Sequence, residues 1–380
     1  MIVLIFLVLK VMQFIQAESS VGAKCHHIAS KHNEYQPEVY FINMDRSVAR
    51  RKATEDQLLE LGLRGHRVKG ITPQELFIPN DLLQTWETRW CLTDSEIPLP
   101  DHLNKSSNAF TGLNKDTRTP YMAIVRGLCG RKRNDAKNTG NQLKELGCTS
   151  SHLEAIRRAV YSNTTKSRFA LIIEDDVFFP FDVDWNALAH SAPPGFGILQ
   201  LFNSNGNTMQ ATWNQYIKNT KQLWVQRHAM KFFDFWSTCA YLIDRETMRE
   251  VIDAVAYRSD GWLNFKIVAG INHPCVPASC CPGGVSGDRF IGVPPCTWAP
   301  RGYQADSLLY ALTKTYMLTM PLITNGQGTN QSTFHQSHVG ALHVRAFAQQ
   351  RKFINMMLNG QVQTPSFARP ACERLIVDSI

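Results

Sequence analysis

The sequence predicts an α/β fold, because short apolar segments rich in β-branched residues alternate with segments of helical periodicity. The clearest of the apolar segments is 169–173 (FALII), which has the composition of a strand buried on both faces of a sheet. A helical pattern precedes it at 152–163, and a strand–helix pair lies near the start, at 39–43 and 48–61. Alternation of this kind favours a layered α/β architecture.

The first strand–helix pair carries polar and basic residues where the strand ends. Residues 39–43 (VYFIN) form the expected strand, and the helix over 48–61 should stop at Gly62, the residue after its C-cap. The start of this helix is crowded with cations: Arg46, Arg50, Arg51 and Lys52. Each cation there opposes the helix dipole by about 0.3–1 kcal/mol, so a docked anion such as a phosphate would favour them. The alternative is an exposed turn whose side chains extend into water.

A second strand is expected at 66–72, and the next clear element is the helix that leads into 169–173. Residues 151–154 (SHLE) form a capping-box pattern, which predicts a helix beginning near His152. Apolar residues follow at helical spacing and should face a sheet: Leu153, Ile156 and Val160. His152 would then lie in the first turn, either bonded to a neighbouring loop or in contact with an active site.

Three carboxylates follow the central strand directly: Glu174, Asp175 and Asp176. An unpaired buried carboxylate costs several kcal/mol or shifts its pKa, so acids at the end of a central strand indicate a partner. Ligands of open α/β sheets bind at this edge, and Mg²⁺ and Mn²⁺ take carboxylate and phosphate ligands. We therefore expect a metal–diphosphate site here, against the alternative of solvated acids in a loop.

Further strands are expected at 197–202 (GILQLF), closed by a turn at 203–206, and at 236–243. Asp244 should cap the following helix, whose apolar stripe consists of Met248, Val251, Ile252 and Val255. Residues 304–312 place Asp306 at the start of a helix-like run, and the last strand is expected at 316–323. A polar loop and then several histidines follow: His335, His338 and His343.

Two stretches interrupt this alternation. Residues 78–145 are irregular and form an expected insertion that could shape an acceptor site. Residues 258–303 form a second insertion, rich in Pro, Gly and Cys. Its cysteines are Cys275, Cys280, Cys281 and Cys296. A disulfide-pinned loop is the favoured interpretation, and zinc is the alternative, although paired CxxC spacing is missing.

Composition limits the classes of protein and of binding partner. The 44% hydrophobic and 19% charged residues among 380 are ordinary values for a globular protein and argue against wholesale disorder. The net charge of +8 suits acidic small molecules, anionic polysaccharide or a membrane surface, and no zinc-finger spacing, RNA-binding signature or long basic run supports a nucleic-acid partner.

Residues 1–17 have the pattern of a secretory signal peptide, and a short signal anchor is the alternative. Such an anchor is the only membrane attachment that we expect from the sequence. The ten cysteines and the sequons at Asn104, Asn163 and Asn330 agree with the secretory pathway. We expect the endoplasmic reticulum or Golgi lumen, or secretion.

Three segments in order, INMDRSVARR (42–51), GCTSSHLEAIRRAV (147–160) and ALIIEDDV (170–177), resemble the signature blocks of glycosyltransferase family 25. That family includes lipopolysaccharide glycosyltransferases and collagen galactosyltransferases. The segments at 235–252 (FWSTCAYLIDRETMREVI) and 304–309 (QADSLL) resemble its later blocks.

The resemblance implies a GT-A-type, Rossmann-like single domain with a mostly parallel central sheet, which we expect over 36–360. The Cys-rich insertion is a departure from the family's pattern. It implies metal-dependent transfer of a hexose, galactose favoured, from a UDP-sugar to a hydroxyl on protein or glycan, with inversion and with Mn²⁺ or Mg²⁺. The donor residues it implies are Asn43, Asp45, Arg46, Arg51, Ser151 and His152. Metal ligands would be Asp176, Glu174 and His343. The catalytic acids would be Asp306 as the base, with a helix cap as the alternative for it, and Asp175 and Glu174, which would assist Asp176 at the metal.

Two other classes remain open on the sequence. One is a carbohydrate- or matrix-binding homologue that has lost turnover. The other is a metal-dependent phosphate-ester hydrolase, which also clusters acids at strand ends, although it leaves the Arg-rich first block unexplained.

Overall fold

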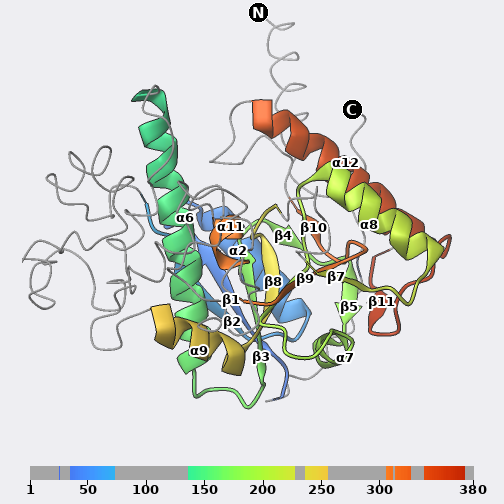
Figure 1. Ribbon diagram of the computed structural model, residues 1–380, viewed down its shortest axis with the longest axis horizontal. Coiled ribbons are helices and arrows are strands. Elements are labelled where there is room, and N and C mark those ends of the chain that lie inside the picture. The colour runs from blue at the N-terminus through green and yellow to red at the C-terminus, as the bar shows by residue number, and fades with distance from the viewer. Residues whose placement is uncertain are drawn as a thin grey trace, which may run out of the picture.

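The computed structural model describes residues 25, 35–72, 136–226, 236–255, 305–310, 313–326 and 338–372. These residues form a mixed α/β fold around a seven-stranded sheet ordered β2-β1-β3-β8-β6-β9-β7 (Figure 1). The strands of the sheet are β1 (Glu38–Asn43), β2 (Gly65–Lys69), β3 (Phe169–Glu174), β6 (Ile198–Gln200), β7 (Trp224–Gln226), β8 (Ala240–Asp244) and β9 (Thr315–Leu318). Two short antiparallel pairs join β4 (Val177–Phe178) to β10 (Thr324–Asn325) and β5 (Phe181–Val183) to β11 (Ala368–Pro370). The helices are α2 (Val48–Glu60), α6 (Ala136–Tyr161), α7 (Trp185–His190), α8 (Gly206–Lys218), α9 (Arg245–Val255), α11 (Ala305–Leu309) and α12 (His338–Leu358).

The sheet is mixed, which confirms the expected mostly parallel arrangement only in part. Strand β1 pairs in parallel with β2 and β3, and β6 pairs in parallel with β9. Strand β8 is antiparallel to both β3 and β6, and β7 is antiparallel to β9. Because Ile173 pairs with Ala240, the residues just before β8 lie beside the residues just after β3. This antiparallel neighbour therefore brings a second chain segment to the acids.

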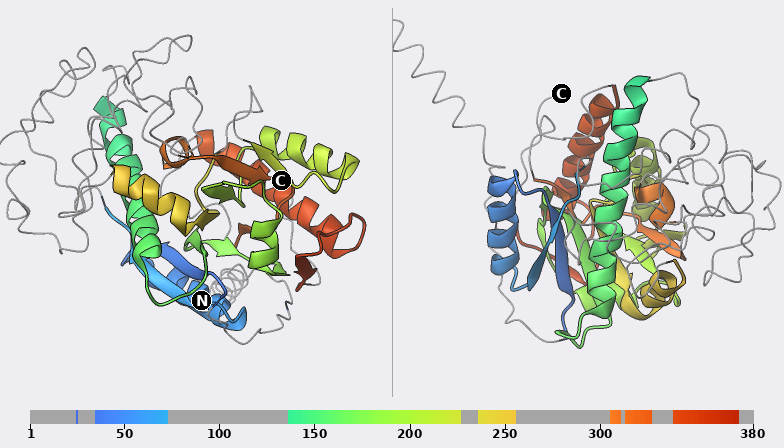
Figure 2. Two further views of the ribbon diagram at one scale, coloured as in Figure 1. Left: turned by 60° about the horizontal axis from the view of Figure 1, so that its bottom comes forward. Right: turned by 90° about the vertical axis from the view of Figure 1, so that its left-hand side faces the viewer.

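Helices α2 and α6 lie on opposite faces of the sheet (Figure 2). Leu171, Ile172 and Ile173 of β3 are fully buried, as expected for a strand covered on both faces. Helix α6 buries Ile156 and Val160 completely. Burying a side chain of this size contributes about 1.5–3 kcal/mol to the stability of the fold. The apolar stripe of α6 therefore accounts for the packing of this helix against the sheet.

Helices α8 and α12 pack side by side (Figure 1), and neither was predicted from the sequence. Asn205 caps α8 by accepting from the backbone N–H groups of Asn207 and Thr208. Trp213 of α8 stacks on Phe353 of α12, with ring centroids 4.6 Å apart. The polar residues of 203–206 were expected to form only a turn, but they also cap a helix.

Helix α6 begins at Ala136, so the predicted start near His152 was wrong. The Ser151 hydroxyl instead accepts from the Ile71 N–H at 2.8 Å and donates to the Gly147 carbonyl at 2.7 Å. Glu154 bonds to Arg157 and Arg158, one turn further on. The two side chains that resembled a capping box therefore have other partners. Ser151 makes a tertiary contact, and Glu154 pairs with arginines three and four residues further along the helix. The insertion boundary predicted at 145 also falls inside this helix.

Gly147 sits where α6 crosses the chain after β2. A Cβ added there would lie 2.5 Å from the backbone oxygen of Ile71, which cannot move as a side chain could. We expect Gly147→Ala to destabilise the fold by about 1–3 kcal/mol, measured as the free energy of unfolding in urea. Gly206→Ala is the matched control, because its added Cβ meets the flexible end of Gln349 at 3.3 Å. Equal stability of the two variants would contradict the close approach.

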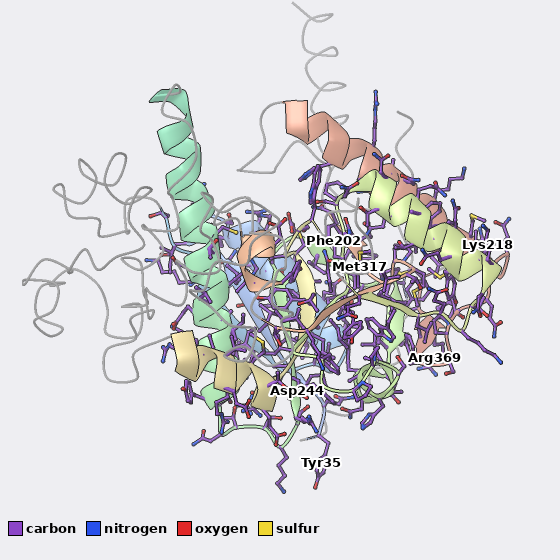
Figure 3. All side chains as sticks on the ribbon, in the orientation of Figure 1. Tyr35, Phe202, Lys218, Asp244, Met317 and Arg369 are labelled. Carbon is purple, nitrogen blue, oxygen red and sulfur yellow. A yellow bond between two sulfur atoms is a disulfide. The ribbon has the colours of Figure 1, made fainter. Side chains whose placement is uncertain are left out.

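Several local predictions are confirmed. Helix α2 ends at Glu60, and Gly62 has φ 66°, the left-handed conformation expected after a C-cap. Asp244 caps α9 by accepting from the N–H groups of Glu246 and Thr247. Met248, Val251 and Ile252 are buried as their stripe predicts. Asp244 pairs with Phe169 at the start of β3, whereas Glu174 is at its end, so this cap is structural rather than part of the acid cluster. Figure 3 shows Asp244 far from Phe202, which lies toward the other end of the strands.

A disulfide joins Cys25 to Cys372, 347 residues apart. The predicted signal peptide at 1–17, the Cys-rich insertion at 258–303, and the sequons at Asn104 and Asn330 lie outside the described residues. Asn163 is described and exposed. Among the described helices, none is long and apolar enough to cross a membrane.

Removing the Cys25–Cys372 disulfide should destabilise the protein, since a bond that closes so long a loop restricts the unfolded chain. The loop-entropy relation gives about 4–6 kcal/mol as an upper estimate for the double serine variant. Urea unfolding of that variant, compared with wild type without reductant, measures the effect. An unchanged midpoint would show that the bond does not stabilise the folded state. Reductant alone is a poorer test, because the chain has ten cysteines.

Candidate active site

The acids gather at the edge of the sheet where β1 and β3 end. Glu174 is the last residue of β3, and Asp175 and Asp176 form the turn into β4. The Glu174 N–H donates to the Cys239 carbonyl at 2.8 Å, and the Gly326 N–H donates to the Asp176 carbonyl at 2.8 Å. The backbone of the acid turn is therefore held from both sides.

Asp175 is a buried carboxylate, 7% exposed, with partners on α2 and β1. It accepts a hydrogen bond of 2.6 Å from Asn43 Nδ2 and pairs with Arg50 Nη1 at 3.2 Å. Burial raises the pKa of Asp175, and Arg50 and Asn43 offset only part of that rise. Asn43, predicted as a donor-binding residue, thus lies in the site and orients an acid.

Asp176 carries the least satisfied oxygen of the cluster. Its Oδ2 accepts from Asn325 Nδ2 at 3.2 Å and lies 3.8 Å from Arg50 Nη1. Its Oδ1 is buried and has no hydrogen-bond partner among the described residues. Burial, together with the charges of Glu174 and Asp175, raises the pKa of Asp176 to about 7. A cation at this position would offset both the burial and the repulsion.

Glu174 is contacted from β8 and α6. Its Oε1 accepts from Thr238 Oγ1 at 3.2 Å and lies 3.5 Å from His152 Nε2. Burial acts to raise the pKa of Glu174, but the contacts with His152 and Thr238 outweigh it and hold the pKa below its usual value. Glu174 is therefore an ionised ligand or electrostatic group rather than a proton donor at neutral pH.

His152 and Ser151, both predicted near the donor, are almost fully buried in α6. His152 reaches the acid cluster through Glu174, and its Nδ1 lies 3.1 Å from the Tyr241 hydroxyl. The Ser151 hydroxyl bonds to the protein backbone instead, at the joint with Ile71 and Gly147.

The first turn of α2 presents Arg50, rather than Arg51, to the acids. Arg51 pairs with Glu55 at 2.8 Å on the exposed side of the helix, and Arg46 is exposed. Thr54 and Gln57 share the face of Arg50: Thr54 donates to the Asp175 carbonyl, and Gln57 bonds to the backbone that follows the acids. A polar stripe at i, i+4 and i+7 was the signal in the sequence that could have identified this face.

Asp45 follows β1 and is paired with two cations of β2. Arg67 Nη2 lies 2.5 Å and Lys69 Nζ 3.0 Å from its carboxylate, and these bonds hold the pKa of Asp45 below its usual value. Arg67 also donates to Asn43 Oδ1 at 3.0 Å. Arg67 therefore links two predicted donor residues, although the sequence did not single it out.

Asp306 in the first turn of α11 holds an unusual turn beside Glu174. Its Oδ2 accepts from the Ser237 N–H at 3.0 Å, and the Tyr310 hydroxyl donates to the Ser237 carbonyl at 2.7 Å. Ser237 has φ 80°, a conformation that is uncommon for a residue with a side chain and that often marks functional sites. Thr238 follows, so Asp306 and Glu174 are linked through two consecutive residues.

Two clusters of potential metal ligands occur among the described residues, Cys148–His152–Glu174 and Glu174–Asp176–Cys239. In each, donor atoms lie within 4.8 Å of one another. His343, predicted as a ligand, belongs to neither; its ring contacts Trp236 and Phe347, with centroids 6.4 and 6.0 Å away.

In proteins with a Rossmann-like sheet, ligands bind outside the carboxyl ends of the strands, where the acids and basic residues of this chain lie. The model of glycosyltransferase family 25 (LPS biosynthesis protein) matches residues 36–260. The chain therefore belongs to glycosyltransferase family 25, a family that implies glycosyltransferase activity with a sugar donor and an acceptor. A search of curated proteins found no match.

Proposed function

We propose that this protein is a GT-A-type, metal-dependent hexosyltransferase that moves a hexose, galactose favoured, from a UDP-sugar to a hydroxyl of a protein or glycan with inversion. The observation that supports it best is Asp176. A partly buried carboxylate whose buried Oδ1 has no hydrogen-bond partner among the described residues, and whose pKa is raised to about 7, suits a cation-binding role. Arg46, exposed just after β1, and Arg50 in the first turn of α2 suit a diphosphate.

Carboxylate oxygens suit Mn²⁺ or Mg²⁺, so the residues present fit the proposed cofactor. Asp176 and Glu174 would hold the ion, with Arg50 balancing part of the remaining charge on Asp175. His343 stays a prediction as a third ligand. A bound divalent ion would stabilise the negative charge that develops on the leaving diphosphate.

The chain's own residues would position and deprotonate the acceptor. The acceptor oxygen forms a bond to the anomeric carbon of the donor, the bond from that carbon to the diphosphate oxygen breaks, and the acceptor proton passes to the base. Asp306 is the proposed base, since the Ser237 N–H fixes its carboxylate beside the acid cluster. Asp45 and Arg46 would face the nucleotide and diphosphate, Asn43 would support the site by holding Asp175, and Arg51 stays a prediction as a donor residue. Ser151 and His152 would support the donor site through buried contacts.

The proposed compartment is the endoplasmic reticulum or Golgi lumen, or the exterior after secretion. The Cys25–Cys372 disulfide supports an oxidising environment, and the proposed signal peptide would direct the chain there.

Nucleotide release from a panel of UDP- and GDP-sugars tests the function, with Mn²⁺ or with chelator and with several hydroxyl acceptors. Release that requires metal and acceptor, together with a sugar–acceptor product, is expected. No release from any donor by folded protein would favour the binding homologue. Metal-dependent release of inorganic phosphate without sugar transfer would favour the phosphate-ester hydrolase.

A further inference from the structure

A thiol, an imidazole and a carboxylate meet on the α6 side of the acid cluster. Cys148 and His152 are four residues apart on α6, a spacing that places both side chains on one face of the helix. Glu174 reaches the same point from the end of β3. The Cys148 Sγ, a ring nitrogen of His152 and a carboxylate oxygen of Glu174 all lie within 4.8 Å of one another.

The imidazole is oriented as a metal ligand would be. His152 is 1% exposed, and its Nδ1 lies 3.1 Å from the hydroxyl of Tyr241 on β8. Its Nε2 is buried, 3.5 Å from Glu174 Oε1, and has no hydrogen-bond partner among the described residues. Metal-binding histidines commonly use one ring nitrogen for a protein hydrogen bond while the other faces the ion. Tyr241 thus holds the ring with Nε2 on the side of Glu174.

The ligand chemistry differs from that of the neighbouring acids. Thiolate and imidazole ligands favour Zn²⁺, whereas Mg²⁺ and Mn²⁺ prefer oxygen. In a tetrahedral zinc site, donor atoms lie about 3.3–3.8 Å apart, so these side chains would need to close by only about 1 Å. Three protein ligands leave a fourth position for water, and the thiol proton would be released on binding.

We propose that Cys148, His152 and Glu174 form a Zn²⁺ site that joins α6 to the end of β3. The site shares Glu174 with the proposed Mn²⁺ or Mg²⁺ site, but its other two ligands, Cys148 and His152, and its preference for Zn²⁺ do not depend on the proposed sugar transfer. A zinc ion there would cross-link a helix to the central sheet, so Zn²⁺ should raise the midpoint of thermal unfolding.

Cobalt provides the probe, since Co²⁺ bound by a thiolate absorbs in the near ultraviolet and Zn²⁺ displaces it. Full-length protein stripped with chelator and titrated with Co²⁺ should develop this band, and added Zn²⁺ should remove it. Cys148→Ser should abolish the band and weaken Zn²⁺ binding by roughly 10–100-fold or more. Cys239→Ser is the matched control, because Cys239 is the other described cysteine outside the disulfide and should leave the band intact.

Two further variants keep the test decisive. His152→Asn should weaken Zn²⁺ binding even if Cys148→Ser does not fold, with circular dichroism to check folding. Asp176→Asn should retain the cobalt band while losing metal-dependent sugar transfer, which separates failure of this site from failure of the proposed enzyme function. Two results would overturn the proposal. One is the absence of a thiolate band in wild type. The other is a thiolate band that persists in Cys148→Ser, because the metal would then bind other cysteines.

Discussion

Replacing Asp176 with asparagine is expected to abolish metal-dependent nucleotide release and, at the same time, to stabilise the metal-free protein at alkaline pH. Activity should fall by about 10²-fold or more, because loss of a group that supports transition-state charge typically has this effect. The same change removes one of three neighbouring negative charges, Glu174, Asp175 and Asp176, from a partly buried cluster. Function and stability should therefore move in opposite directions.

The pH dependence of stability follows from the raised pKa of Asp176, about 7. A carboxyl whose folded-state pKa lies above its unfolded value stabilises the fold fully below about pH 4, and that contribution is lost as the pH rises through about 7. Metal-free wild type should thus lose thermal stability between pH 5 and pH 8 relative to Asp176→Asn. Mn²⁺ should stabilise wild type and not the variant.

Thermal unfolding at the two pH values, with chelator or Mn²⁺, measures these effects beside nucleotide release. Asp56→Asn is the matched control, because Asp56 is exposed on α2, away from the acids, and forms an ion pair with Lys52. Asp176→Asn that retains activity within about threefold of wild type would remove Asp176 from the metal site.

Replacing Asp306 with asparagine should lower kcat by about 10²–10⁴-fold, the usual contribution of a general base, with little change in the KM of the donor. Asparagine can still accept from the Ser237 N–H, so the turn at Ser237 should persist while the proton acceptor is lost. The pH–rate profile should lose the limb that reports ionisation of the base.

Tyr310→Phe is the control for an effect that arises only from the position of the turn at Ser237. The Tyr310 hydroxyl also bonds to Ser237, through its carbonyl, but it cannot act as the base. Gln200 Nε2 also donates to that carbonyl at 3.1 Å, so we expect a loss of less than about tenfold. If Asp306→Asn lost no more activity than Tyr310→Phe, Asp306 would act by holding the turn rather than by taking the proton.

Local chemistry made much of the fold predictable from the sequence alone. The uninterrupted apolar run of β3 predicts a strand covered on both faces, and the three acids that follow it mark where the strand must end. Gly62 ends α2 because only a left-handed conformation fits there, and Asp244 starts α9 because its carboxylate satisfies free backbone N–H groups. Each signal acts within about one helical turn, so each is readable from adjacent residues.

The start of α6 shows where local signals fail. Ser151 and Glu154 match a capping box, but neither side chain caps the helix. Ser151 accepts a hydrogen bond from the Ile71 N–H, and Glu154 accepts from two arginines of the same helix. The choice between Arg50 and Arg51 is similar, since both belong to one helix turn and only the docking of α2 decides which faces the acids. Helices α8 and α12 were missed because their stability depends on packing against each other.

The sequence by itself determined the acid cluster, the strand that carries it and the basic helix start beside it, because these follow from neighbouring residues. Only the tertiary structure decided that β8 runs antiparallel beside β3, which brings Thr238, Cys239 and Tyr241 to Glu174 and His152. It also placed Asn325 and Asp306 at the same edge from distant parts of the chain. Strand order and partner choice depend on how whole elements bury their apolar faces together, a free energy that no local stretch of sequence contains.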